Sequence, residues 1–226
     1  MDLRFWRKKR LLTAVVITII IVASFAFLAT LKFDYDRENN AALQYFASQP
    51  GMPDAFSALE RLTPSDAVVM CWWDYGLAVK EWSHREVIEA YPSKEIADSV
   101  GSTRTLWGNL EAQLFGKWGS NEKIRDIALA FMLNEESSLQ VLRKYNAKYV
   151  LVFVPDELEK FHWIAKIAGY NATDYLTYND TTQAYEPTTR AQEVTLLHLI
   201  YEETWQPRHF TKIFNNDKAK IYKINY

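Results

Sequence analysis

The feature that most constrains the fold is an uninterrupted apolar stretch near the N-terminus. Residues 11–31 read LLTAVVITIIIVASFAFLATL, 21 positions without a charged residue, a proline or a glycine. As a helix that rises about 1.5 Å per residue, this stretch spans roughly the 30 Å hydrocarbon layer of a bilayer. The alternative is a cleaved signal peptide, whose apolar core normally has only about 7 to 15 residues and precedes a small-x-small cleavage site. The sequence has neither property, so we predict a retained transmembrane helix at residues 11–31.

The residues before this stretch predict its orientation. Five of the first ten residues are basic, namely Arg4, Arg7, Lys8, Lys9 and Arg10. Basic flanks of a membrane span remain on the cytoplasmic side. We therefore expect a single-pass protein of the cell membrane, with a cytoplasmic leader at residues 1–10 and an extracytoplasmic domain at residues 32–226.

The charge balance bears on the class of partner. The leader carries five basic residues and one acid (+4), so the remainder carries −6 to give the net charge of −2 for the whole chain. Binding of nucleic-acid phosphates requires a concentrated basic face. A mildly acidic domain therefore predicts that nucleic acid is not a partner.

Cysteine and histidine usage limits the covalent and metal chemistry. Cys71 is the only cysteine, so the chain forms no internal disulfide, and its stability must come from packing. The four histidines lack paired metal-ligand spacing; they are His84, His162, His198 and His209. We expect no metal or other cofactor to be bound by this chain alone.

Two short apolar runs predict the fold class. Ala67–Cys71 (AVVMC) and Tyr149–Val154 (YVLVFV) have the continuous apolar character of strands that are buried on both faces. Between them, apolar residues recur at helical intervals from 93 to 133 with a break near 116–121, and a further helix capped by Asn134 ends at Asn146. A strand, helices and a second strand predict a mixed α/β domain with a buried, largely parallel sheet.

The remaining segments complete the predicted order of elements. Four more helices and one hairpin are expected: helices at Asp34–Ser48, Pro53–Leu62, Asp156–Ala168 and Ala191–Tyr201, and a hairpin formed by Phe210–Phe214 and Ala219–Ile224.

A tandem tryptophan motif follows the first predicted strand. It consists of Trp72, Trp73, Asp74, Tyr75 and Gly76. This pentapeptide resembles the signature of the catalytic subunit of oligosaccharyltransferases from archaea and eukaryotes, and the preceding residues 63–71 (TPSDAVVMC) are similar to the archaeal members. The resemblance covers about Asp54 to Tyr226, which corresponds to the C-terminal globular domain of that family. The stretch at 11–31 resembles the last transmembrane helix before that domain.

A second motif lies after the second predicted strand. The family carries an acid-x-x-Lys-x-x-x-Met/Ile pattern on a helix, and Glu157, Lys160 and Ile164 fit its spacing. Residues at i, i+3 and i+7 share one helix face. The sequence departs from the family in having Glu157 where Asp is usual, and the neighbouring Asp156 is one position out of phase.

The resemblance implies that these two motifs together recognise the acceptor sequence Asn-x-Ser/Thr. Asp74 accepts a hydrogen bond from the Ser/Thr hydroxyl, and the indole of Trp72 or Trp73 donates one to it. Ile164 is expected to contact the threonine methyl group, and Gly76 is expected to let the chain turn closely behind the pocket. The resemblance assigns no catalytic residue to this chain.

The resemblance also implies what the complete enzyme contains. The family's other transmembrane segments, with the acidic loops that bind a divalent metal and the lipid-pyrophosphate donor, are absent from this sequence. The expected partners are therefore a polytopic transmembrane subunit, an acceptor polypeptide and, through that subunit, a lipid-linked oligosaccharide. Mn or Mg is expected in the complete enzyme.

Simpler interpretations of the same residues remain open. Adjacent tryptophans at a strand end are usually core packing, Lys160 alone is more often a solvated helix lysine, and acids near 156–159 are typical of a first helical turn. An alternative function is a membrane-anchored accessory protein that binds acceptor sequences without catalysis, or a degenerate paralogue. Asn171-Ala172-Thr173 and Asn179-Asp180-Thr181 are themselves acceptor sequences, so Asn171 and Asn179 are possible glycosylation sites.

Overall fold

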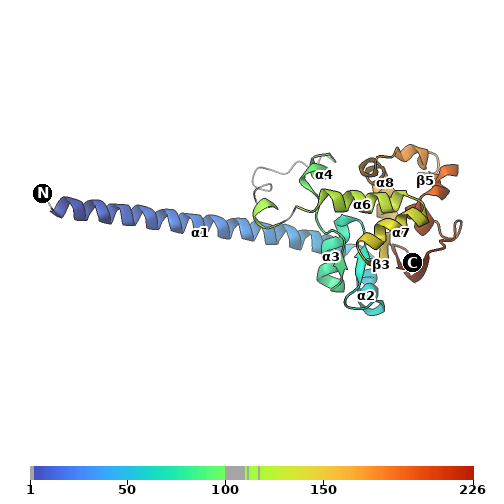
Figure 1. The fold of residues 1–226 in the computed structure, drawn as a ribbon, viewed down its shortest axis with the longest axis horizontal. Helices are drawn as coiled ribbons and strands as arrows, with labels where there is room; N and C mark the ends of the chain where they lie inside the picture. The colour runs from blue at the N-terminus through green and yellow to red at the C-terminus, as the bar shows by residue number, and fades with distance from the viewer. Residues whose placement is uncertain (1–2, 100–109, 111, 117) are drawn as a thin grey trace.

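A long helix leads into a folded α/β domain in the computed structural model, which describes residues 3–99, 110, 112–116 and 118–226. This helix, α1 (Leu3–Ser48), has 46 residues and projects away from the rest of the chain (Figure 1). Its part from Thr13 to Ser48 is long and apolar enough to cross a membrane, judged by length and composition. The side chains of the basic leader lie outside those that the structure describes.

The continuity of α1 corrects one prediction. A separate helix at Asp34–Ser48 was expected, but the structure has one helix through both segments. The reason is local, since no proline or glycine occurs before Pro50 and nothing therefore interrupts the helical backbone hydrogen bonds. Gly51, at φ +81°, then turns the chain into α2 (Met52–Leu62), as predicted for residues 53–62.

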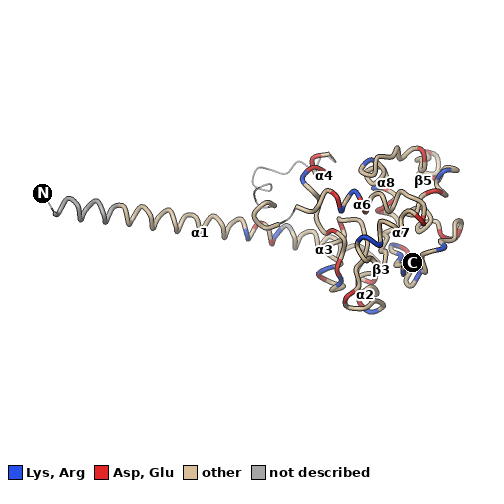
Figure 2. The backbone as a smooth tube through the Cα atoms, in the orientation of Figure 1, with Lys and Arg blue, Asp and Glu red and all other residues tan. Residues whose placement is uncertain are grey.

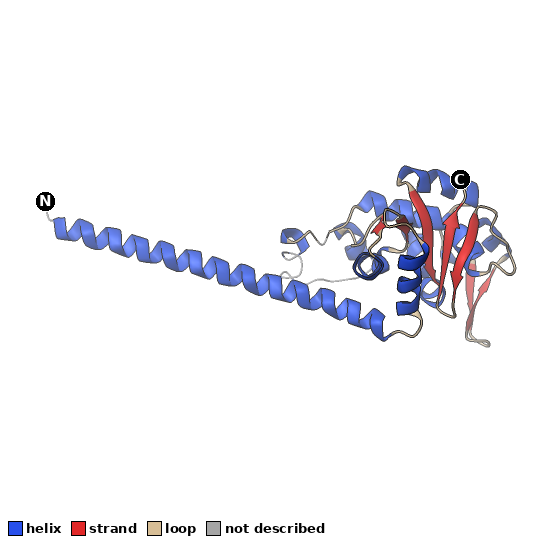
Figure 3. Cartoon of the chain, turned by 90° about the horizontal axis from the view of Figure 1, so that it is seen from below, coloured by secondary structure: helices blue, strands red, loops and turns tan. Residues whose placement is uncertain are grey.

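The central sheet has five strands in the order β2-β1-β3-β7-β6. β1 pairs in parallel with β2 and β3, whereas β7 is antiparallel to both β3 and β6, so four of the five strands point the same way. The strands are β1 (Val68–Met70), β2 (Glu86–Val87), β3 (Ala147–Phe153), β6 (Phe210–Asn215) and β7 (Ala219–Ile224). The predicted mixed α/β fold and the C-terminal hairpin are confirmed, and Figure 3 shows the sheet among its helices.

Helices and a small hairpin surround this sheet. They are α3 (Trp73–Ser83), α4 (Lys94–Ser99), α6 (Asn121–Met132), α7 (Glu135–Lys144), α8 (Val154–Ala168), α9 (Thr195–Ile200), the 3-10 helices η1 (Ala172–Asp174) and η2 (Thr189–Glu193), and the hairpin β4 (Leu176–Asn179) with β5 (Ala184–Pro187). The predicted cap of α7 is confirmed, because Asn134 Oδ1 accepts a hydrogen bond from the Ser137 amide at 3.0 Å. Residues 100–109 of the predicted helical region lie outside the described residues.

One predicted helix is wrong in its start. The segment Ala191–Tyr201 was expected to be one helix, but η2 ends at Glu193 and α9 begins at Thr195. Val194, which joins them, has extended backbone angles and a buried side chain. Burial of this β-branched residue therefore outweighs the continuation of the helix.

The sheet order brings the two sequence motifs together. β1 and β3 are parallel neighbours, with Val69 opposite Tyr149 and Met70 opposite Val150. Their carboxyl ends therefore lie at the same edge of the sheet, where β1 leads into α3 and β3 leads directly into α8. Residues 72–76 and 156–160 consequently meet, although more than 80 positions separate them along the chain.

Charged residues of both signs are distributed over the folded domain. Figure 2 shows Lys and Arg segments interspersed with Asp and Glu segments along its helices and loops. The absence of a nucleic-acid partner stays a prediction.

Candidate functional site

The tryptophan motif forms the junction between β1 and α3. Trp72 has extended backbone angles (φ −61°, ψ 139°) and precedes the first helical residue, Trp73. The Trp72 side chain is buried, and its ring centroid lies 6.2 Å from that of Trp73. Asp74 follows in the first turn of α3, where the helix dipole favours an acidic side chain.

Lys160 on α8 connects the two motifs. Its ammonium lies 2.8 Å from Asp74 Oδ2, donates a hydrogen bond to the Tyr75 hydroxyl at 3.0 Å, and lies 4.5 Å from the centroid of the Tyr75 ring. The Tyr75 hydroxyl in turn donates to Asp156 Oδ2 at 3.2 Å. We call Asp74, Tyr75, Asp156 and Lys160 the acid–lysine cluster. Lys160 is therefore a paired, partly buried lysine and not a solvated one.

The cluster is fixed to the core through the ring of Tyr75. Tyr75 is fully buried, and its ring centroid lies 4.5 Å from that of Phe153 on β3 and 5.7 Å from that of Phe46 on α1. Aromatic pairs at these separations contribute about 0.5–1.5 kcal/mol beyond the area they bury. The motif thus packs against both the sheet and the end of the long helix.

The charges of the cluster respond to burial and to one another. Burial raises the pKa of Asp74, and the ion pair and hydrogen bond with Lys160 offset only part of this effect. Burial acts to lower the pKa of Lys160, but the carboxyl groups of Asp74, Glu157 and Asp156 together outweigh it, so that pKa is raised. Burial and the surrounding carboxyl groups raise the pKa of Tyr75, which keeps its hydroxyl protonated as a donor to Asp156.

Two polar atoms of the motif are buried without a hydrogen-bond partner among the described residues. They are Trp73 Nε1, a donor, and Asp74 Oδ1, an acceptor. Stranding such groups costs about 1–3 kcal/mol each, so they are rare in folded proteins unless a ligand or water completes them. A hydroxyl group can satisfy one donor and one acceptor at the same time, because it both accepts and donates.

No family model matches the chain. Subunit stt3 of the dolichyl-diphosphooligosaccharide–protein glycosyltransferase of Schizosaccharomyces pombe is 27% identical over 202 residues, which cover 82% of this chain and 23% of the relative. Subunit stt-3 of the corresponding Caenorhabditis elegans enzyme is 25% identical over 186 residues, which cover 76% of this chain and 21% of the relative. The chain thus spans less than a quarter of the length of these relatives.

The fold is similar to that of a solved domain over nearly the whole length of that domain. The C-terminal globular domain of an oligosaccharyltransferase from Archaeoglobus fulgidus superposes with a TM-score of 0.51 at 20% identity, and the match covers 78% of this chain and 98% of that domain. The chain is similar in sequence to the STT3 subunits of oligosaccharyltransferases. Its folded part has the fold of an oligosaccharyltransferase C-terminal globular domain, as the sequence predicted.

Asp156 belongs to the cluster in this oligosaccharyltransferase-like domain, although the family spacing did not select it. The spacing selected Glu157, yet Asp156 is the residue that bonds to Tyr75. A signal was present in the sequence, because Asp156 and Lys160 stand at i and i+4 and hence share a helix face. The second carboxylate of the cluster therefore precedes the family position by one residue.

Glu157 occupies a different environment. Its side chain is fully buried, and neither carboxyl oxygen has a hydrogen-bond partner among the described residues. Burial raises its pKa well above the ordinary value, and the Lys160 charge offsets this only in part. A buried carboxyl group without a partner is most stable as the neutral acid.

This environment predicts how stability depends on pH. In the unfolded chain Glu157 loses its proton near pH 4.5, whereas the folded protein retains it to higher pH. Between these two pKa values the unfolded state binds fewer protons, so Glu157 lowers the free energy of unfolding by about 1.4 kcal/mol per pH unit. We expect Glu157→Gln to remove this contribution, as measured by urea unfolding in detergent micelles at a series of pH values above 4.5. Glu159→Gln, an exposed neighbour on α8, is the control, and equal slopes for Glu157→Gln and the wild type would contradict the assignment.

Gly76 is required for close packing rather than for a turn. It lies inside α3, and a Cβ atom placed there would lie 2.5 Å from Ala90 Cα and 2.6 Å from the Glu89 carbonyl oxygen. The expectation that Gly76 allows a turn of the chain is therefore wrong, because Gly76 lies within a helix. The glycine instead lets α3 approach the segment after β2.

Ile164 lies on α8 in the hydrophobic core and is fully buried. Its contact with a threonine methyl group stays a prediction. The two acceptor sequences lie beyond α8 and differ in environment. Asn171 is exposed and its side-chain amide donates to Asp174 Oδ1 at 3.2 Å, whereas Asn179 is held in the β4–β5 hairpin by Glu186 and the Thr181 amide.

Proposed function

We propose that this chain recognises acceptor sequences of the form Asn-x-Ser/Thr for an oligosaccharyltransferase. The supporting observation is that two consecutive motif residues each carry a buried polar atom without a partner among the described residues, the donor Trp73 Nε1 and the acceptor Asp74 Oδ1. A Ser or Thr hydroxyl would complete both, by donating to Asp74 and accepting from Trp73, whereas an Ala side chain would complete neither. Because both atoms lie below the surface, the hydroxyl reaches them only after a local opening, for which part of the binding free energy is used.

Lys160 sets the charge state of this site. Its ammonium is bound to Asp74 Oδ2, so the other oxygen of the same carboxylate remains free as an acceptor. In the proposal, the hydroxyl site consists of Trp73, Asp74 and Lys160. Its backbone is fixed by Trp72, Tyr75 and Gly76. The buried residues beneath it are Glu157 and Ile164. Ile164 places apolar surface near the threonine methyl group, which is worth roughly 0.8 kcal/mol, or about a fourfold preference for Thr over Ser.

The metal of the complete enzyme belongs elsewhere in the proposal. Among the described residues, no group of three or more His, Cys, Asp or Glu side chains has the arrangement to hold a metal ion. The carboxylate pair of the site, Asp74 and Asp156, already surrounds Lys160 and Tyr75, and the ammonium 2.8 Å from Asp74 would repel a divalent cation. We place the Mn or Mg ion and the lipid-pyrophosphate donor in a polytopic transmembrane part. This chain contributes acceptor positioning, which is a proximity effect.

The membrane arrangement is part of the same proposal. The apolar part of α1 crosses the bilayer, residues 1–10 remain cytoplasmic, and residues 32–226 lie on the outer side, where acceptor polypeptides and the donor meet. α1 then contacts both the bilayer and the cluster, because Phe46 near its end packs against Tyr75.

A peptide titration of the full chain in lipid nanodiscs tests the hydroxyl site. With 5-fluorotryptophan incorporated, we expect the Trp73 fluorine signal to shift on addition of a blocked Asn-Ala-Thr peptide, and about tenfold less affinity for Asn-Ala-Ala, a difference of about 1.4 kcal/mol. The preference disappears in Asp74→Ala, which removes the acceptor. It persists in Asp156→Ala, which removes a carboxylate that the hydroxyl does not contact. Equal binding of the two peptides by the wild type would overturn the proposal and favour the motif as core packing.

A further inference from the structure

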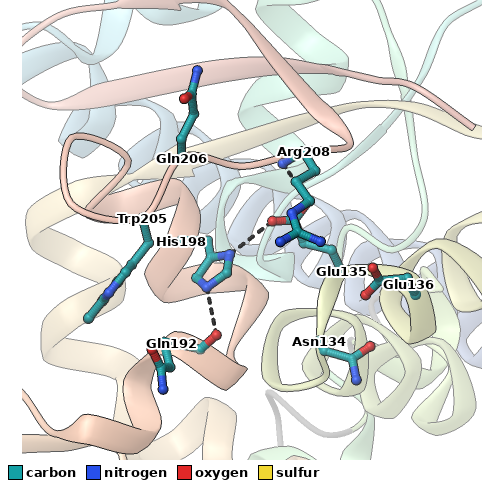
Figure 4. A pocket seen from close by; sticks show the side chains of 8 residues that line it. All are labelled: Asn134, Glu135, Glu136, Gln192, His198, Trp205, Gln206 and Arg208. Atoms are coloured by element: carbon teal, nitrogen blue, oxygen red, sulfur yellow. Dashed lines mark hydrogen bonds and ion pairs between the residues drawn. The ribbon is translucent and has the colours of Figure 1, made fainter.

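A polar pocket lies on the folded domain outside the acid–lysine cluster. It encloses about 340 Å³, at the small end of the range for small-molecule sites. Its lining comes from the start of α7, from η2, from α9 and from the loop before β6; the residues are Asn134, Glu135, Glu136, Gln192, His198, Trp205, Gln206 and Arg208. In Figure 4, Trp205, His198 and Gln192 lie on one side, with Arg208, Glu136 and Asn134 on the other.

The floor of this pocket is a satisfied ion pair. Glu135 is buried; its Oε1 lies 2.9 Å from His198 Nδ1, and its Oε2 accepts the amides of Arg208 and His209 at 2.9 Å each. His198 Nε2 lies 2.7 Å from the Gln192 carbonyl oxygen. Both ring nitrogens thus face acceptors, which favours the protonated imidazole, and the hydrogen bond to Glu135 raises the pKa of His198. Both imidazole nitrogens and Glu135 Oε2 are thus fully engaged, and these contacts hold the pocket in shape.

The groups that remain for a ligand have a distinctive composition. The Trp205 indole is half-buried, in a T-shaped contact with Tyr201 and with its ring centroid 6.1 Å from that of His198. Around it stand the exposed amide side chains of Asn134, Gln192 and Gln206, with one carboxylate, Glu136, and one guanidinium, Arg208. Planar amides both donate and accept, and the single negative and positive charges offset each other.

We infer that this pocket binds a neutral hexose unit of a glycan. The C–H face of a pyranose ring is apolar and matches the indole of Trp205, while its hydroxyl groups require donors and acceptors, which the amides, the acid and the guanidinium supply. A phosphate or nucleotide is a poor fit, because the Glu136 carboxylate repels it and Arg208 is the one cation of the lining with free donors. An apolar ligand would leave the polar lining desolvated. The site is independent of the hydroxyl site and does not require acceptor recognition to operate.

Saturation-transfer NMR on the full chain tests the hexose site. The chain is held in lipid nanodiscs or in a detergent without a sugar headgroup, because maltoside or glucoside detergents would occupy the pocket. The probes are methyl α-glucoside, methyl α-mannoside and N-acetylglucosamine, with inorganic phosphate as the competitor. We expect saturation of the ring C–H protons of at least one sugar, with a millimolar dissociation constant that phosphate does not change.

Variants separate this site from non-specific binding. Trp205→Ala is expected to abolish the transfer, and Trp163→Ala, a tryptophan on α8 outside the pocket, is expected to leave it unchanged. Gln192→Ala is a milder variant that is not expected to unfold the protein, because it truncates an exposed side chain and keeps the backbone carbonyl that accepts from His198. It is expected to weaken sugar binding about fivefold to tenfold, the effect of losing one hydrogen bond. Absence of transfer to all three sugars, competition by phosphate, or equal transfer in Trp205→Ala and the wild type would overturn the inference.

Discussion

Glu135→Ala is expected to lower the free energy of unfolding by about 3–5 kcal/mol, the cost of removing one partner of a buried ion pair. The substitution leaves the His198 imidazolium without its counterion and strands the backbone amides of Arg208 and His209, which both donate to Glu135. Each orphaned group adds its own desolvation cost. The measurement is urea unfolding of the full chain in detergent micelles, followed by tryptophan fluorescence.

The pH dependence of this effect distinguishes the ion pair from simple packing. The pKa of Glu135 is lowered, since the hydrogen bonds from His198 and the two amides outweigh burial, so its contribution is complete above pH 4.5 and is lost as pH falls through the folded value. The raised pKa of His198 gives a contribution that is complete below pH 6.5 and is lost as pH rises through the folded value. The destabilisation by Glu135→Ala should therefore be greatest between pH 4.5 and 6.5.

The adjacent residue provides the matched control. Glu136 stands in the same first turn of α7 but is exposed, so Glu136→Ala is expected to change stability by no more than about 0.5 kcal/mol. Similar losses for the two variants, or a loss in Glu135→Ala that does not vary with pH, would show that helix capping and not the buried pair is responsible.

Gly76→Ala is expected to destabilise the protein by about 1–3 kcal/mol or more, contrary to helix propensity. Inside a helix, Ala is normally more favourable than Gly by up to about 1 kcal/mol, so propensity alone predicts stabilisation. The added Cβ, however, would lie 2.5 Å from Ala90 Cα and 2.6 Å from the Glu89 oxygen. Because both are backbone atoms, α3 must move away from the segment after β2, which displaces Asp74 and Tyr75 from Lys160. Loss of peptide binding should accompany the loss of stability.

Two further variants define the cause of the Gly76 effect. Lys80→Ala, an exposed substitution on the same helix, is expected to be nearly neutral. Ala90→Gly combined with Gly76→Ala should not restore stability, since the closest contacts involve backbone that Ala90→Gly retains. Full rescue by this double variant would mean that the Ala90 methyl group, 3.0 Å from the added atom, is the true obstacle.

The sequence predicted those features that depend on local patterns. The apolar runs that become β1 and β3 and the cap at Asn134 are encoded within a few residues each, and the structure has them. The meeting of Lys160 with the tryptophan motif followed from a family resemblance, and its physical reason is the parallel pairing of β1 with β3.

What the sequence did not predict depends on long-range packing. The choice of Asp156 over Glu157 as the partner of Tyr75 reflects which side of α8 faces the motif, and helical spacing alone does not fix this. The role of Gly76 depends on the backbone of Ala90, which only the folded chain brings near. The pocket around Trp205 joins four separate segments and has no signature in the sequence.

Because α1 is uninterrupted, it fixes the angle of the folded domain about the helix axis relative to the apolar stretch at residues 11–31. Beyond the apolar stretch it continues through residues 32–48, about 25 Å of rigid stalk at about 1.5 Å per residue, and its Phe46 packs on Tyr75. Each residue inserted into this stalk would turn the proposed acceptor site by about 100° around the helix axis, whereas an insertion of eighteen residues, five whole turns, would raise the site without turning it. In the proposed assembly, the length of α1 thus sets the rotational orientation of the acceptor site relative to the membrane-embedded part.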